Sequence, residues 1–136
     1  MIIKLLKKVK NGLKIIKMIE KFERIKNNCL LAIFDGYEFV NERWLYAENN
    51  GFFVPFGTVE EIRYDSTHNW YIMSVVDKIE KLGYNVIIVQ RSCVIAGGEP
   101  DILGATLRIN NDGDTKIEAV WRTCGEFVEF YNKNLK

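Results

Sequence analysis

The fold class is decided by residues 67–96, THNWYIMSVVDKIEKLGYNVIIVQRSCVIA, where a helical pattern gives way to two strand patterns. The apolar spacing predicts a helix over 67–82, which Gly83 would end as a C′ residue. Its stripe consists of Trp70, Met73, Val76 and Ile79, thickened by Ile72, Val75 and Leu82. Runs rich in Val and Ile at 85–90 and 92–96 predict strands.

Downstream of these strands the chain repeats the strand-then-helix order. Residues 106–109 read as a further strand, and 110–114 (NNDGD) as a turn. Thr115 and Glu118 fit a capping box, which predicts a helix over 116–132. Its apolar stripe is Ile117, Val120, Trp121, Cys124, Phe127, Val128 and Tyr131. We therefore expect an α+β fold, with a mostly antiparallel sheet covered on one face by two helices.

Upstream, aromatic runs flank a turn signal. Residues 44–46 (WLY) and 52–54 (FFV) lie on either side of Asn49-Asn50-Gly51, which predicts a hairpin. Residues 61–64 are a further strand candidate. The hairpin region is rich in rings, which favour a core and cross-strand pairs over an exposed binding surface: Tyr37, Trp44, Tyr46, Phe52, Phe53 and Phe56.

The N-terminal stretch predicts an added amphipathic helix over residues 2–26. Its stripe recurs at spacings of four and three: Ile2, Leu6, Val9, Leu13 and Ile16, extended by Ile19, Phe22 and Ile25. Asn27-Asn28 is a candidate N-cap and Gly36 a candidate stop, so 29–35 is either a short helix or a buried strand. The expected division is a helix over 1–26 and a single α+β domain over 28–136.

Charge is distributed unevenly between these parts. The whole chain has a net charge of +1. Residues 1–28 contain nine basic and two acidic residues, a net charge of +7, while the remainder contains ten basic and sixteen acidic residues, a net charge of −6. The basic surface is expected at Lys4, Lys7, Lys8, Lys10, Lys14 and Lys17. The basic helix is expected to be attracted to acidic surface on its own body or on a neighbouring copy.

Two segments resemble a family of small phage, prophage and gut-bacterial proteins without a known activity. The matching stretches are residues 64–84 (YDSTHNW…VVDKIEKLGY) and 116–132 (KIEAVW…EFVEFYN). The resemblance implies a phage-type setting. Members of that family begin near the segment matching 28–36, so Met18 is a natural start and residues 1–17 are expected to be an extension that the domain does not need to fold.

Composition excludes several classes of protein. The chain is 48% hydrophobic and 27% charged, which is typical of a globular domain. Its three widely spaced cysteines and single histidine predict no disulfide framework, no metal site and no cofactor. No apolar run reaches the length of a signal peptide or a transmembrane span, so we expect a cytoplasmic protein.

Candidate ligand-binding residues are few, and no catalytic residue is assigned. His68 and Asn69 stand at an expected helix start, where free N–H groups attract anions. Arg91 and Arg108 are candidate anion partners for the same pocket. Capping by Asp65 or Ser66, with Trp70 in the core and His68 as a solvated turn residue, is the favoured interpretation of these residue types.

Three functions follow as hypotheses. The first is a non-catalytic binding protein of phage type, acting on a host protein or sequestering a small ligand. The second is an enzyme with an anion pocket near His68. The third is a nucleic-acid or membrane-surface binder acting through the basic helix, although no aromatic residue precedes Phe22 to stack on bases. The apolar stripe is expected to pack on the chain's own core or on a second copy, giving a homodimer that depends on residues 1–17.

Overall fold

The computed structural model describes residues 2–40, 43–46, 52–53, 63–65 and 71–135, and their side chains apart from those of 2–16, 39–40, 43–46 and 52–53. The elements follow in the order α1 (Ile2–Phe34), β1 (Tyr37–Val40), β2 (Arg43–Tyr46), β3 (Phe52–Phe53), α2 (Ile72–Lys81), β4 (Tyr84–Val89), β5 (Ser92–Gly97), β6 (Leu107–Asp112) and α3 (Lys116–Asn134).

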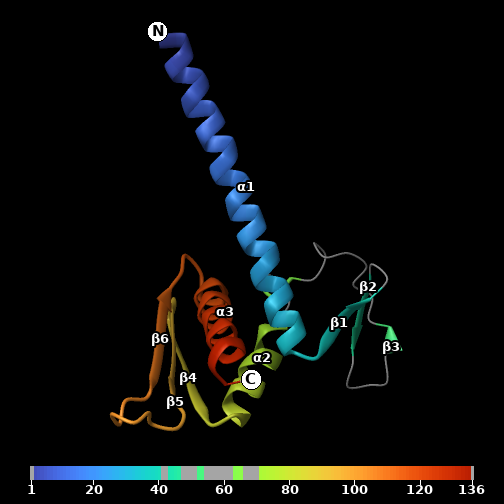
Figure 1. Cartoon of the computed structure of the whole chain (residues 1–136), viewed down its shortest axis with the longest axis vertical. Helices are drawn as coiled ribbons and strands as arrows, with labels where there is room; N and C mark the ends of the chain where they lie inside the picture. Colours follow the sequence, from blue (N-terminus) through green and yellow to red (C-terminus); the bar gives the residue numbers. More distant parts are fainter. Residues whose placement is uncertain (1, 41–42, 47–51, 54–62, 66–70, 136) are drawn as a thin grey trace.

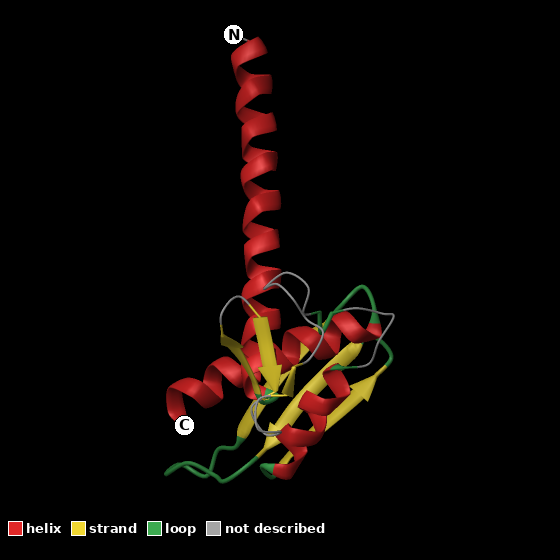
Figure 2. Ribbon diagram, turned by 90° about the vertical axis from the view of Figure 1, so that its right-hand side faces the viewer, coloured by secondary structure: helices red, strands yellow, loops and turns green. Residues whose placement is uncertain are grey.

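The body is the predicted α+β unit. Strands β4, β5 and β6 form an antiparallel sheet with β5 in the middle, and α2 and α3 cover one face of it (Figure 2). Burial alternates along each strand, so Cys93 and Ile95 of β5 lie in the core while Ile87 and Val89 of β4 are exposed on the other face. The fold class expected from the sequence is confirmed.

Helix α3 supplies much of the core. Thr115 caps it, because its side-chain oxygen accepts a hydrogen bond from the Glu118 N–H at 3.1 Å. The Glu118 carboxylate pairs with Arg122 one turn later, at 2.7 Å. Phe127 is fully buried, and its ring lies edge-on to Tyr84 with 4.8 Å between the centroids. The predicted inward face is confirmed for Ile117, Val120, Cys124, Phe127 and Val128, whereas Trp121 and Tyr131 are only half-buried.

Helix α2 is shorter in the described part than the predicted 67–82. It begins at Ile72, and residues 66–70, including the predicted core residue Trp70, lie outside the described residues. Gly83 adopts a φ of +100°, a conformation that favours glycine, and so ends the helix as expected. The buried residues of α2 are Ile72, Val75, Val76 and Ile79.

A second small antiparallel sheet contains the predicted hairpin. Strand β2 pairs with both β1 and β3, and Tyr46 stands opposite Phe52. The turn at 49–51 and the ring of Phe56 lie outside the described residues, as do the side chains of the aromatic residues in β2 and β3. Arg63 and Tyr64 follow an irregular path, so the described part of the strand candidate at 61–64 is not a strand.

Two boundaries expected from the sequence are wrong. Asn27-Asn28 does not start a new helix, because α1 runs through both residues and ends only at Phe34, with Gly36 at a φ of +105° after it. Residues 29–34 are therefore helix. The turn expected at 110–114 is also misplaced, since Asn110, Asn111 and Asp112 continue β6 and pair with Val94, Cys93 and Ser92.

Helix α1 extends far beyond the body. Its 33 residues span about 50 Å at 1.5 Å per residue. The C-terminal part packs on α3 and β1, while the N-terminal part projects straight away from both sheets (Figure 1). We call residues 24–34 the α1 base, since Arg24 is the first partly buried residue, and residues 2–23 the α1 arm.

Candidate functional site

The α1 arm is the most distinctive surface of the chain. Between residues 2 and 19 the only charged residues are six lysines, and the first acidic residue is Glu20. On a helix, positions 2, 6, 9, 13 and 16 share one face. The arm therefore combines an apolar stripe with lysine positions outside it.

The backbone of the arm lies apart from the described part of the body. In both views its backbone projects away from the described sheets and from α2 and α3 (Figures 1 and 2). Where side chains are described, large apolar groups are open to solvent: Met18 is 57%, Ile19 49% and Phe22 67% exposed. Packing on the chain's own core, one of the two expectations from the sequence, is therefore wrong for Ile19 and Phe22, while the stripe side chains of residues 2–16 lie outside the described part.

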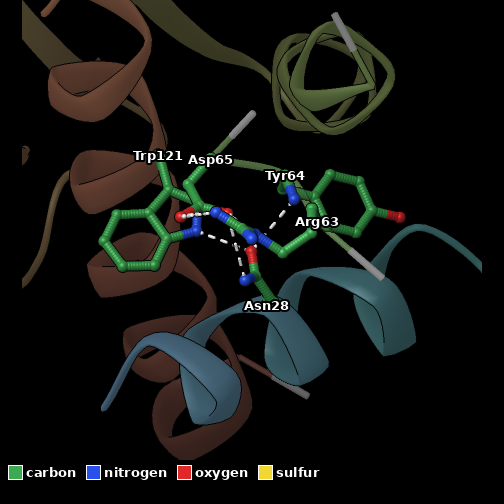
Figure 3. Close-up of polar contacts among 5 residues, drawn as sticks. All are labelled: Asn28, Arg63, Tyr64, Asp65 and Trp121. Atoms are coloured by element: carbon green, nitrogen blue, oxygen red, sulfur yellow. Dashed lines mark hydrogen bonds and ion pairs between the residues drawn. The ribbon is translucent and has the colours of Figure 1, made fainter. Parts of the chain in front are cut away.

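The base is held by a buried amide. Asn28 is 1% exposed, and its Oδ1 accepts hydrogen bonds from the Tyr64 N–H at 3.0 Å and from the Trp121 Nε1–H at 2.8 Å (Figure 3). Its Nδ2 donates to Asp65 Oδ1 at 3.2 Å. One side chain thus ties α1 to α3 and to the segment 63–65, and the direction of the arm is fixed by these bonds.

Asp65 closes the outer side of this network. Its two carboxylate oxygens accept from Arg63 Nε at 2.8 Å and Nη2 at 3.1 Å, a bidentate pair (Figure 3). Burial on its own would raise the pKa of Asp65, but the hydrogen bonds and charge of Arg63, with the Asn28 amide, lower the pKa below its ordinary value. The carboxylate is therefore ionised at neutral pH and attracts both neighbours.

A second polar cluster caps the end of the base. Asp35 is buried, and its carboxylate accepts from the Tyr64 hydroxyl at 2.8 Å and from the Ser74 hydroxyl at 2.5 Å. Lys78 of α2 forms an ion pair with this carboxylate at 3.3 Å and donates to the Asp35 carbonyl oxygen. A cation at the C-terminal end of α1 also complements the helix dipole. The cluster joins α1 to α2 as Asn28 joins it to α3.

Close packing between α1 and α3 depends on Gly125. A Cβ built at this position would lie 1.8 Å from Asn27 Oδ1, so no larger residue fits without moving Asn27. Asn27 in turn donates from Nδ2 to the Trp121 carbonyl oxygen at 3.2 Å. The Asn27 side chain of α1 therefore packs directly on the backbone of α3 at Gly125 and Trp121.

Above this contact the two helices leave an open groove of about 990 Å³ between α1 and α3. Trp121 and Asn111 line its floor, and its walls carry lysine, arginine and glutamate side chains from both helices. Lys26 and Glu129 form an exposed ion pair across it at 3.5 Å. Since both signs of charge alternate along the walls, the groove does not favour one class of ion.

The residues expected to bind a ligand are not brought together in the described part. His68 and Asn69 lie outside the described residues. Arg91 is in the β4–β5 turn next to Ser92, whereas Arg108 pairs with Ala96, four residues further along β5 and so about 13 Å away. Both arginines are exposed, and they do not form one anion pocket.

The lysines of the basic surface all belong to the arm. Lys17 is exposed, and the side chains of Lys4, Lys7, Lys8, Lys10 and Lys14 lie outside the described part of the structure. Asn28, Asp35 and Asp65, which fix the arm, were not selected from the sequence as site residues. Their partners Tyr64 and Trp121 lie 36 and 93 residues from Asn28, so no local pattern indicates them.

No helix among the described residues is long and apolar enough to cross a bilayer. Within the same part of the chain, no group of three or more His, Cys, Asp or Glu side chains is placed to hold a metal ion. Neither protein-family models, nor curated proteins, nor solved structures give a match to this chain.

Proposed function

We propose that this chain is a binding protein that attaches to an anionic membrane surface through the α1 arm. The observation that carries the proposal is the projection of the arm, whose backbone extends away from the described sheets and from α2 and α3 (Figure 1), with Ile19 and Phe22 exposed on it. A helix with apolar residues on one face and lysines on the remainder lies in the membrane interface, with its apolar face among the acyl chains.

The energetics of such binding use both features of the arm. Burying a large aliphatic side chain contributes about 1.5–3 kcal/mol, and the stripe offers five. Each lysine near an anionic surface adds about 1 kcal/mol, and six lysines precede the first acidic residue. Because the arm is already helical, part of the cost of ordering it on the membrane is absent.

The two other partners considered for the basic helix use only part of this surface. Nucleic acid would engage the lysines but leave the apolar stripe exposed. A host protein would need an acidic surface next to an apolar groove of matching length. The phage-type setting and a host-protein partner remain predictions from the sequence.

Flotation with lipid vesicles tests the proposal. The full chain should bind vesicles containing phosphatidylglycerol and bind phosphatidylcholine vesicles at least tenfold more weakly, with added salt reducing the difference. Leu6→Gln with Leu13→Gln should abolish binding, and Lys7→Gln with Lys14→Gln should weaken it. The matched control is Ile87→Gln, which changes an exposed apolar residue of the sheet and should leave binding intact.

Two results would contradict membrane attachment. One is equal binding of the stripe variant and the unmodified chain to anionic vesicles. The other is absence of vesicle binding together with tight, salt-dependent binding to duplex DNA, which would show that the lysines of the arm bind nucleic-acid phosphates.

A further inference from the structure

The loop between β5 and β6 presents an apolar tip. Ile102 and Leu103 are 103% and 91% exposed, so they touch essentially nothing in their own chain. No other described large apolar residue is exposed above 67%, the value for Phe22. A pair of fully exposed aliphatic side chains side by side indicates a contact with another molecule.

The tip is held in shape by its own hydrogen bonds. The Asp101 carboxylate accepts from the N–H groups of Leu103 and Ala105, both at 2.9 Å. The Asp101 N–H donates to the Ala105 carbonyl at 2.8 Å, and the Gly104 N–H donates to the Asp101 carbonyl at 2.9 Å. Such an ordered loop loses little conformational freedom when its tip is buried in a partner.

The C-terminal ends of the three helices leave an apolar hollow on the same chain. Its volume is about 450 Å³, the space of roughly fifteen water molecules. Ile33 and Leu82 at its wall are 54% and 45% exposed, and Phe34 and Tyr131 complete its apolar lining. Lys78 and Lys81 stand at its edge.

Tip and hollow have complementary charge. Glu99 and Asp101 flank the tip, while the exposed Lys81 lines the hollow beside Lys78, which is already paired with Asp35. The exposure of Ile102 and Leu103 means that the tip does not fill the hollow of its own chain. An anionic membrane would repel the two acidic residues beside the tip, so a lipid surface is a poorer partner for it than this hollow.

We propose that the tip at Ile102 and Leu103 inserts into the helix-end hollow of a second copy of the chain. The loop and the C-terminal ends of α2 and α3 lie at the end of the body opposite to the arm (Figure 1). Two copies related by a two-fold axis then exchange tips, which closes the assembly as a dimer. This interface involves none of residues 1–17, through which the sequence alone had suggested a dimer.

Light scattering and sedimentation equilibrium of the full chain test the interface. Ile102→Asp with Leu103→Asp should raise the dissociation constant of the dimer by more than about thirtyfold, because the tip is its central apolar anchor. Leu82→Asp in the hollow should have the same effect. Since these residues are exposed, circular dichroism should show the fold of each variant unchanged.

Charge reversal identifies the partner surface. Glu99→Lys and Lys81→Glu should each weaken the dimer about tenfold, and the two changes combined should restore most of the affinity. Ile87→Asp on the open sheet face and the arm variant Leu6→Gln with Leu13→Gln should leave the dimer intact.

A monomeric unmodified chain, a dimer retained by the tip variant, or failure of the combined reversal to restore affinity would overturn the proposal. Loss of vesicle binding by the tip variant in place of dimer dissociation would also overturn it, in favour of a lipid-inserting loop.

Discussion

The two parts of α1 share one backbone conformation and differ in everything that surrounds it. The base contacts α3, β1 and the segment 63–65, and its Asn28, Leu31 and Ala32 are buried, as is Asp35 directly after it. The arm projects from the body, and its described side chains from Lys17 to Glu23 are exposed. The helical form of the base is supported by tertiary packing, and that of the arm by its sequence.

This difference separates two roles that a single helix can have. The base is held in place by the buried Asn28 amide and by the buried Asp35 carboxylate directly after it, because each accepts hydrogen bonds from other parts of the chain. The arm adds nothing described to the core, and in the proposed function its stripe binds the membrane. Changes in the base should therefore affect stability, and changes in the arm should affect binding.

The largest expected loss of stability follows from Asn28→Leu. Leucine leaves the Tyr64 N–H and the Trp121 indole N–H without their acceptor, at about 1–3 kcal/mol for each unsatisfied group. We expect the free energy of unfolding, measured with urea, to fall by about 2–6 kcal/mol. Asn27→Ala is the control, since it removes only one bond at 3.2 Å and should cost about 1 kcal/mol. Equal costs for both variants would show that Asn28 does not fix the base.

A smaller loss is expected from Gly125→Ala. The new methyl group would displace the Asn27 side chain, which outweighs the gain of about 1 kcal/mol in helix propensity. We expect a net loss of about 1–2 kcal/mol by thermal or urea unfolding, within the usual range for overpacking. The same change made in the Asn27→Ala background should be neutral or stabilising. Destabilisation there as well would mean that the clash involves the helix backbones.

Acid should weaken the base through Asp65. Its pKa is lowered in the folded protein, so it contributes stability above the pKa of an unfolded aspartate, near 3.9, and loses that contribution as the pH falls through the lowered value. Unfolding measured between pH 7 and pH 2 should show this loss. Asp65→Asn should reduce the pH dependence of the free energy of unfolding in this range. An unchanged pH dependence would show that the Asp65 carboxylate does not stabilise the base.

The smallest effect is expected in the arm. A chain starting at Met18 should melt cooperatively, with a free energy of unfolding within about 0.5 kcal/mol of that of the full chain, because the backbone of the missing residues projects away from the described body. Circular dichroism with thermal melting measures this. Loss of the cooperative melt would show that the arm belongs to the core.

Local patterns predicted the elements that are stabilised by local and nearest-neighbour contacts. Apolar periodicity predicted α2 and α3, and a capping signal predicted the start of α3 at Thr115. Runs rich in Val and Ile predicted β4 and β5. The resulting layer of two helices on one antiparallel sheet followed from their order along the chain.

Long-range contacts explain the errors. Asparagine is common at caps and turns, so Asn27-Asn28 was interpreted as a helix start and Asn110-Asn111 as a turn. In the fold, Asn28 is paired across 36 and 93 residues, and Asn111 is a strand residue opposite Cys93. Tertiary pairing overrides the local preference in both places, and a single sequence does not reveal those partners.

Hydrogen–deuterium exchange along α1 tests the division into arm and base most directly. In the free protein, amides of residues 26–34 should exchange slowly and those of residues 4–16 rapidly, because only the base is protected by tertiary contacts. Anionic vesicles should slow exchange in residues 4–16 and leave residues 26–34 unchanged. Uniform slow exchange along the whole helix in the free protein, or no change in the arm on anionic vesicles that bind the chain, would contradict this account.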